Sequence, residues 1–188
     1  VLTVKEEEFR PLKSGEVIYQ NINRSKYNPY KIIVKKDNWI YLNDHNQEFD
    51  VNLEDFSIIS NNTKIKLEVA FIIIHGSPGE NGLIQSYFEL KNIPYTGCNS
   101  YTSALTFNKR DCLSILEKHD IPTANSFHIN KNEKFETDHI IQKVGLPCFV
   151  KANRSGSSFG VFKVYKDNEL KEYINKALEY DNEVLVES

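Results

Sequence analysis

The sequence lacks methionine and has few cysteines. Only Cys98, Cys112 and Cys148 are present among 188 residues, and they form no CxxC pair. An odd and widely spaced set argues against a disulfide framework or a structural zinc site, so we expect free thiols in a reducing cytoplasm. Because a natural start supplies methionine, we also expect that part of the N-terminus is missing, processed or altered.

Long apolar runs and a strong excess of one charge are also absent. No run approaches the roughly 20 apolar residues of a membrane span. A signal peptide is not visible, because charged residues between Lys5 and Arg10 interrupt the apolar N-terminal ones. With 23 basic and 26 acidic residues, the formal charge of -3 gives no support for broad binding to nucleic acid or to an anionic membrane. The sequence therefore predicts a cytoplasmic protein with neither nucleic acid nor a membrane as its partner.

The residues that are present suffice for a packed core, since 40% are hydrophobic and 12% aromatic. The length allows one or two domains, and we place a boundary within residues 97–107. The longest apolar run, residues 69–74, has the length of a strand and is typical of one covered on both faces. For the first domain, residues 1–100, the patterns predict a helix over 14–23, strands over 30–35, 39–42 and 69–74, loops over 43–64, and a helix from residue 83 with Leu83, Ile84, Tyr87 and Phe88 facing inward.

The second domain, residues 101–188, alternates strands and helices. Its clearest helix carries apolar residues with helical spacing at Leu170, Tyr173, Ile174, Ala177 and Leu178. A helix over 100–119 and a helix over 138–144 are also predicted, with strands over 126–129, 147–151, 160–165 and 183–187. The last strand ends the chain, so we expect that this domain is cut. The alternation indicates the α/β class.

A glycine loop between two strands is the most informative feature. The apolar run Cys148 to Val150 leads into Lys151, and the polar loop that follows ends at Gly160. Glycine permits unusual backbone angles, and successive N–H groups can then face phosphate oxygens. Neither the P-loop pattern nor GxGxxG is present. A flexible β-hairpin with a polar tip would explain the glycines equally well, but a lysine that ends an apolar strand needs an anionic partner.

A second turn-rich loop, residues 75–82, follows the apolar run and contains His75 and Glu80. Ligands in open α/β sheets favour this kind of position at a strand terminus, although a plain turn with a solvated Glu80 would have the same pattern. Lys109 within its helix and Glu187 at the end of its strand are each compatible with an ordinary surface residue. His45, His119, His128 and His139 show no metal-ligand spacing, so no metal site is predicted within the chain.

Together these segments resemble the D-alanine–D-alanine ligase family of the ATP-grasp superfamily over roughly residues 14–188. The matching stretches are HGSPGENG at 75–82, IPYTG at 93–97, SALTFNK at 103–109, GLPCFVK at 145–151, GSSFG at 156–160 and DNEVLVE at 181–187. The lysine, strand and glycine-loop pattern is shared by ATP-grasp enzymes in general. The HGxxGE loop with IPYTG is much more specific to this family.

The resemblance implies a Rossmann-like pre-ATP-grasp domain over residues 1–100, followed by the small α+β lobe of an ATP-grasp domain over 101–188. It implies that ATP phosphorylates one D-alanine to an acyl phosphate, which the amine of a second D-alanine attacks. The product serves peptidoglycan precursor synthesis, and the enzyme is implied to be a homodimer through its first domain. Mg²⁺ or Mn²⁺ would be needed, with ligands in a further lobe beyond residue 188.

The roles that the resemblance implies fall on named positions. Lys109 and Lys151 would hold ATP phosphates, and Glu187 would lie at the adenine–ribose side. The loop, with Gly156, Ser157, Ser158 and Gly160, would close over the phosphates, and Ser157 would also lie near the second D-alanine. His75 and Glu80 would belong to the substrate cleft.

Two departures from the family pattern bear on these expectations. The family's first loop carries a glutamate that contacts D-alanine, and only Glu7 falls in its register, with different neighbours. Without the metal-binding lobe we expect the 188-residue chain alone to be inactive. A D-alanine–D-lactate ligase, another ATP-grasp carboxylate–amine ligase, and a non-catalytic nucleotide-binding module remain as alternatives.

Overall fold

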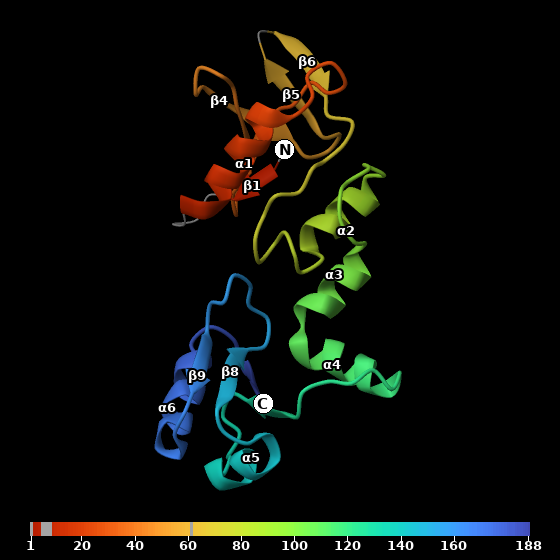
Figure 1. The fold of residues 1–188 in the computed structure, drawn as a ribbon. Helices are drawn as coiled ribbons and strands as arrows, with labels where there is room; N and C mark the ends of the chain where they lie inside the picture. Colours follow the sequence, from red (N-terminus) through yellow and green to blue (C-terminus); the bar gives the residue numbers. More distant parts are fainter. Residues whose placement is uncertain (1, 5–8, 61) are drawn as a thin grey trace. The chain divides into compact units, whose positions relative to one another are not determined.

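A computed structural model describes residues 2–4, 9–60 and 62–188, with side chains described from residue 14 onward apart from residue 61. The chain forms two compact units, residues 1–100 and 101–188 (Figure 1). Glu7, the residue in the register of the family's first glutamate, lies outside the described residues. None of the helices in the described part is long and apolar enough to cross a membrane.

The first unit is built on a six-stranded sheet in which the strands lie in chain order. The first pair, β1 (Leu2–Val4) and β2 (Lys31–Val34), is parallel and is connected through α1 (Phe9–Asn21). Each later neighbour pairs antiparallel. These later strands are β3 (Trp39–Leu42), β4 (Glu48–Asn52), β5 (Ser57–Ser60) and β6 (Thr63–Lys66). Parallel pairing in this sheet is therefore confined to β1 and β2 among the described residues.

The loops predicted over residues 43–64 are wrong, because this stretch contains β4, β5 and the start of β6. Single apolar residues alternate with polar ones here, and they supply the buried face. Val51 and Ile58 are buried and directly paired across β4 and β5, while Glu48 and Asn52 are exposed. A half-buried strand needs only this alternation, not a continuous apolar run.

The strand predicted over residues 69–74 is also not formed as expected. Ala70 makes an isolated parallel bridge with Tyr95, and its backbone bonds run to Pro94 and Thr96. Val69 and Phe71 are 53% and 40% exposed, so the run is not covered on both faces. Ala70 and Ile74 are buried in the core, and the segment leads into the loop that begins at His75.

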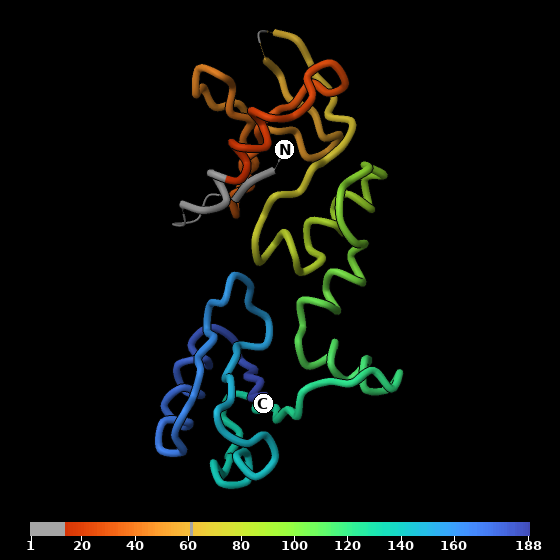
Figure 2. Tube along the Cα trace, in the orientation of Figure 1, coloured from red at the N-terminus to blue at the C-terminus, as the bar shows by residue number. Residues whose placement is uncertain are grey.

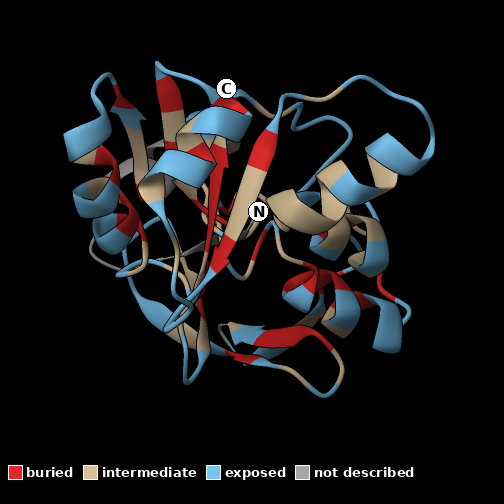
Figure 3. Cartoon of the chain, turned by 90° about the horizontal axis from the view of Figure 1, so that it is seen from below, coloured by how far each residue is buried: buried red, intermediate tan, exposed pale blue. Residues whose placement is uncertain are grey.

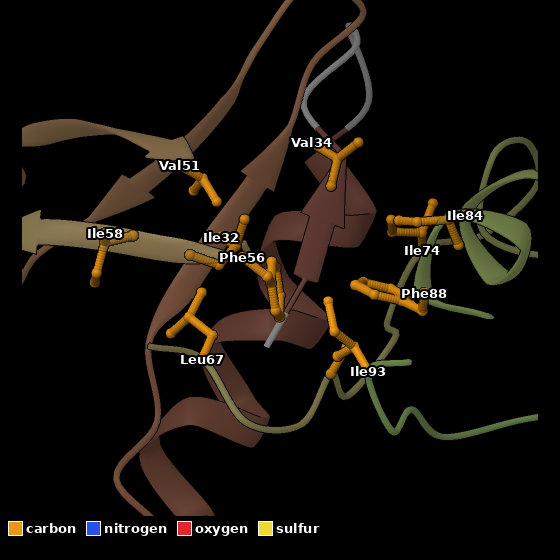
Figure 4. Packing of buried hydrophobic residues seen from close by; sticks show 11 residues of the cluster. Ile32, Val34, Val51, Phe56, Ile58, Leu67, Ile74, Ile84, Phe88 and Ile93 are labelled. Atoms are coloured by element: carbon orange, nitrogen blue, oxygen red, sulfur yellow. The ribbon is translucent and has the colours of Figure 1, made fainter. Parts of the chain in front are cut away.

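The core of the first unit joins the sheet to α2 (Leu83–Leu90). Figure 4 shows Phe56 and Phe88 meeting between the strands and the helix, and their ring centroids are 5.3 Å apart. Ile84 and Phe88 face inward as predicted, and Tyr87 is partly buried against the same cluster, but Leu83, the first residue of the helix, is 62% exposed. Val17 on α1 is likewise exposed.

The second unit has a four-stranded antiparallel sheet in the order β7-β10-β8-β9. The helices α5 (Thr137–Val144) and α6 (Asp167–Ala177) pack on it, and Ile140 and Ile174 are fully buried in its core. Figure 3 shows buried segments running along the strands and on one side of the helices. The strands are β7 (Ser126–Asn130), β8 (Cys148–Ala152), β9 (Val161–Val164) and β10 (Glu183–Glu187).

The single helix predicted over residues 100–119 is two helices, α3 (Ser100–Phe107) and α4 (Lys109–Lys118). They are separated at Asn108, whose backbone is extended with φ -86° and ψ 100°. The Asn108 side chain accepts a hydrogen bond from the Asp111 backbone N–H, the ordinary N-cap arrangement. Lys109 is therefore the first residue of a helix, not a mid-helix residue.

Candidate functional site

The glycine loop connects β8 to β9 and projects from one end of the two strands (Figure 2). Two backbone bonds close it. The Ala152 N–H donates to the Gly160 carbonyl at 2.9 Å, and the Phe159 N–H donates to the Gly156 carbonyl at 3.0 Å. Strand register pairs Lys151 with Val161, so the loop begins directly beyond the last paired residues.

The backbone of the loop explains its small residues. Ser157, Ser158 and Gly160 have φ values of 49°, 62° and 63°, all in the left-handed region. At Gly160 a Cβ atom would lie 2.9 Å from the Ala152 Cβ and 3.0 Å from the Tyr180 ring. Real Cβ atoms avoid such approaches, so this position requires glycine on both conformational and steric grounds.

Lys151 lies on the face of the sheet that α6 does not cover, beside Glu187 on the neighbouring strand β10. The Lys151 Nζ donates to Glu187 Oε1, and the two side chains are only 23% and 18% exposed. The Lys151 Nζ also lies 5.5 Å from the centroid of the Phe149 ring. The predicted need of this lysine for an anionic partner is met within the chain by Glu187.

Lys109 reaches the base of the loop from α4. Its ammonium donates to the carbonyls of Ala152, Asn153 and Ser155 at 3.1, 3.1 and 2.9 Å. An ammonium has three donors, so these bonds use all of them. Burial lowers the pKa of Lys109, and the nearby charge of Lys151 lowers it further. Of the two lysines predicted at the phosphates, Lys109 is therefore bonded to the loop, while Lys151 precedes the loop with its ammonium on Glu187.

Asn153 is a residue that the sequence patterns did not single out. It follows β8 directly, is 1% exposed and bonds through every polar atom of its amide. The amide nitrogen donates to Asn108 Oδ1 and to Glu183 Oε2, both at 2.8 Å, and the amide oxygen accepts from the Arg110 N–H at 2.9 Å. The sequence shows only that an asparagine directly follows the strand that carries Lys151. Its burial, which marks it as important, cannot be read from one sequence.

A charged pair also supports the start of the loop. Arg154 donates from its backbone N–H and its guanidinium to Asp181, at 2.6, 3.2 and 2.9 Å. Burial alone would raise the pKa of Asp181, but the bonds from Arg154 outweigh it and hold that pKa below its usual value. The first residues of the loop are thus tied to the turn that precedes β10.

In the first unit, His75 and Glu80 lie at the two ends of one tight loop. The His75 Nδ1 and Glu80 Oε1 are 4.0 Å apart, and both side chains are about half exposed. Glu80 also accepts from the Gly76 N–H at 2.7 Å, and its own N–H donates back to the Gly76 carbonyl. A Cβ on Gly79 would meet Ile74 at 2.3 Å, so only glycine lets the loop turn this tightly.

The loop is anchored to α2 by a buried amide. The Gln85 Nε2 donates to the Gly79 carbonyl at 2.6 Å, while its Oε1 is buried without a partner among the described residues. The Gly79 carbonyl requires a donor, which fixes the amide in this orientation. The predicted residues His75 and Glu80 are therefore brought together, both exposed, on a rigidly held turn.

The residues of the second unit fit the phosphates of a nucleotide. The Lys109 ammonium bonds the first carbonyls of the loop, while Lys151 precedes the loop on β8 and has its ammonium on Glu187. The loop backbone is left-handed. Cations combined with backbone N–H groups are what a phosphate chain requires. No group of three or more His, Cys, Asp or Glu side chains suited to a metal lies within the described part of the chain. The residues present therefore do not form a site for a divalent cation by themselves.

Comparison with known proteins identifies the family. Residues 11–98 match the family model described as D-ala D-ala ligase N-terminus, and residues 115–188 match D-ala D-ala ligase C-terminus. The D-alanine–D-alanine ligase of Flavobacterium johnsoniae is 48% identical over 177 residues, which are 94% of this chain and 55% of that protein.

Solved structures agree with this match. D-alanyl-alanine synthetase A from Vibrio cholerae superposes with a TM-score of 0.83 at 29% identity, covering 99% of this chain and 57% of that one. The VanG D-Ala:D-Ser ligase from Enterococcus faecalis gives 0.79 at 27% identity, covering 100% and 60%. The mixed α/β fold with its glycine loop is thus that of the ATP-grasp ligases. The chain belongs to the D-alanine–D-alanine ligase family. It spans about half the length of the relatives that it matches.

Proposed function

We propose that the full-length protein containing this chain joins two D-alanine molecules into D-alanyl-D-alanine with consumption of ATP, for peptidoglycan precursor synthesis in the cytoplasm. The observation that carries the proposal is a glycine loop that directly follows Lys151 and whose first carbonyls bind Lys109, in a chain of this family. A carboxylate is a poor acyl donor, and phosphorylation gives it a good leaving group. A carboxylate oxygen of the first D-alanine attacks the terminal phosphorus and ADP leaves; the second amine then attacks the acyl carbon and phosphate leaves.

Residues 101–188 act in this proposal as the nucleotide-binding lobe. Lys109 and Lys151 hold phosphate oxygens, each exchanging a present partner for the ligand, and the loop of Gly156, Ser158 and Gly160 supplies backbone donors. Glu187 serves the adenine–ribose side. These groups act by positioning reactants and neutralising charge, without a covalent adduct.

Residues 1–100 act as the substrate domain. His75 and Glu80 are exposed on a rigid turn, as a cleft for a zwitterionic amino acid requires. Ser157, on the glycine loop, belongs to the network that orients the second amine. We further propose a homodimer through the first domain. Mg²⁺ or Mn²⁺ would be held by residues other than those described here, since these contain no acidic cluster.

A second candidate differs only in the acceptor substrate. The likeness to the D-Ala:D-Ser ligase, at 27% identity, favours D-serine as an alternative second substrate, and a D-lactate acceptor belongs to the same class. D-serine differs from D-alanine in the size of its side chain, and D-lactate attacks through a hydroxyl instead of an amine. The products therefore differ in mass, and product analysis separates the candidates.

The proposal is tested by incubating the full-length protein with ATP, Mg²⁺ and D-alanine, alone or with equimolar D-serine or D-lactate, and identifying products by mass spectrometry. D-alanyl-D-alanine as the main product, with one ADP released per dipeptide, supports it. A mixed product assigns the alternative acceptor. Nucleotide binding without any product would assign a non-catalytic nucleotide-binding module instead and overturn the ligase assignment.

A further inference from the structure

We infer that Asn153 is a positioning residue for nucleotide binding: its buried amide fastens the first turn of α4 to the base of the glycine loop and thereby sets the place of Lys109. The inference rests on the proposed function for its ligand, ATP. The anchoring itself is a property of the chain and is testable without any ligand.

Several contacts of Asn153 are with the start of α4. Asn108 Oδ1 accepts from the Asn153 amide and from the Asp111 N–H, so the residue that caps α4 is also the residue bonded to Asn153. The Arg110 N–H donates to the Asn153 side chain, and the Lys109 N–H donates to the Asn153 carbonyl at 3.4 Å. The first N–H groups of a helix have no partner within it. Here, Asn153 satisfies two of them.

The same residue fixes the loop on its other side. The Asn153 N–H donates to the Glu183 carbonyl at 2.9 Å, and its amide donates to the Glu183 carboxylate. Glu183 also pairs with Arg110 Nη1 at 3.2 Å. Asn153 therefore joins β10, the loop and α4 through one side chain, all within the second unit.

Lys109 depends on this junction. Two of the three carbonyls that hold its ammonium belong to Asn153 and to Ala152 before it, and its own Cα is one residue from Asn108. If α4 is released from Asn153, the Lys109 backbone and the carbonyls around its ammonium move independently. A buried network of this kind loses several bonds when one member is removed.

The first arm of the test measures anchoring by hydrogen exchange of the 188-residue chain. The variant Asn153→Ala is compared with Asn168→Ala, an exposed asparagine on α6 of the same unit. We expect the amides of residues 109–111 to exchange about tenfold faster in Asn153→Ala, the effect of losing one net hydrogen bond, with α6 unchanged. Asn168→Ala should leave both segments as they were.

The second arm measures ATP kinetics in the full-length protein. We expect the KM for ATP to rise about tenfold in Asn153→Ala with the KM for D-alanine unchanged, since a general loss of stability would not separate the two. The variant Asn108→Ala removes the hydrogen bond between Asn108 and Asn153 from the α4 side. It tests the positioning role if Asn153→Ala fails to fold. In the double variant the two effects on the KM for ATP should not add.

The possible outcomes are separable. Unchanged exchange at residues 109–111 in a folded Asn153→Ala or Asn108→Ala variant overturns the inference, even if the protein is an active ligase. Faster exchange with an unchanged KM for ATP likewise removes the positioning role. If the parent protein shows neither ATP binding nor turnover, the proposed function fails, and so does the nucleotide role of Asn153, while the exchange arm still measures the anchoring.

Discussion

Gly160 shows how a single residue determines the shape of the candidate site. Its φ is 63°, and a Cβ there would press against Ala152 and Tyr180 at about van der Waals overlap. Gly76 has a similar φ of 73°, but a Cβ there would meet nothing within 4 Å. Replacing either glycine would therefore introduce backbone strain, but only a side chain at position 160 would also clash with its neighbours.

We predict that Gly160→Ala lowers the free energy of unfolding by about 2–4 kcal/mol, the sum of left-handed strain and overpacking. Gly76→Ala should cost only about 1 kcal/mol, from strain alone. Urea denaturation of both variants measures the difference. Equal losses at the two positions would show that the contact with Ala152 and Tyr180 is not what constrains the loop.

Residue-scale reasoning from the sequence singled out the two lysines and Glu187, but it missed Asn153 and the pair of Arg154 and Asp181. Lys109 was singled out only through the family resemblance, whereas Lys151 stood out because a lysine that ends an apolar strand needs an anionic partner. Asn153 did not, because an asparagine in a loop is ordinary until its burial is known, and its partners Asn108 and Glu183 are 45 and 30 residues away. Contacts of that range leave no local pattern.

At the scale of elements, the start of the glycine loop is held by the pair of Arg154 and Asp181. The pKa of Asp181 is lowered in the folded chain, since the Arg154 bonds outweigh the effect of burial. A carboxyl with a lowered folded pKa stabilises the fold above its unfolded value, near 3.9, and this contribution is lost as pH falls through the folded pKa.

We therefore predict that the second unit loses about 1 kcal/mol between roughly pH 5 and pH 2 through this pair, a figure reduced because Arg154 is partly exposed. Arg154→Met should abolish that part of the acid dependence and lower stability at neutral pH. Arg24→Met, on the first unit, serves as the control. Thermal melts of residues 101–188 across this pH range measure it, and an Arg154→Met profile parallel to that of the parent would contradict the assignment.

Elements with a strong local pattern were predictable. Residues 39–42 and 183–187 form strands with the predicted bounds, and α6 buries Leu170, Ile174 and Ala177 as its spacing indicated. The stretch 43–64 was missed because β4 and β5 carry only one buried apolar residue each and β6 carries none. For residues 69–74 a strand was predicted that does not form as expected, since hydrophobicity alone does not say which strands are available to pair with the run.

At the scale of the whole molecule, two separate cores support the two candidate loops. The cluster containing Phe88 and the cluster containing Ile174 share no residue. Each candidate loop is attached to one of them: the His75 loop leads into α2, and the glycine loop leaves β8. Stability in each unit should therefore respond to its own core.

We predict that Ile174→Ala destabilises residues 101–188 by about 2–5 kcal/mol while leaving exchange in β2 and β3 unchanged. Phe88→Ala should do the reverse, with a loss of about 3–5 kcal/mol confined to the first unit. Hydrogen exchange resolved by peptide measures both. A uniform rise in exchange across the chain in either variant would mean that the cores unfold as one.

The acidic residues available in the whole chain bear on its activity. The described residues contain no acidic cluster for a divalent cation, and phosphoryl transfer relies on such ions for charge neutralisation. The 188-residue chain alone is therefore predicted to release no ADP with D-alanine and ATP, in contrast to the full-length protein. Robust turnover by the chain itself would contradict this.

The central claim is that the lysines at the glycine loop form the nucleotide site, and Lys151 tests it most directly. The measurement is the dissociation constant of ATP for the full-length protein, by calorimetry, in Lys151→Ala and in Lys171→Ala, an exposed lysine on α6 of the same unit. Loss of a charge-assisted bond to phosphate predicts a rise of about 10- to 100-fold for Lys151→Ala and none beyond twofold for Lys171→Ala. An unchanged dissociation constant in a folded Lys151→Ala variant would contradict the account.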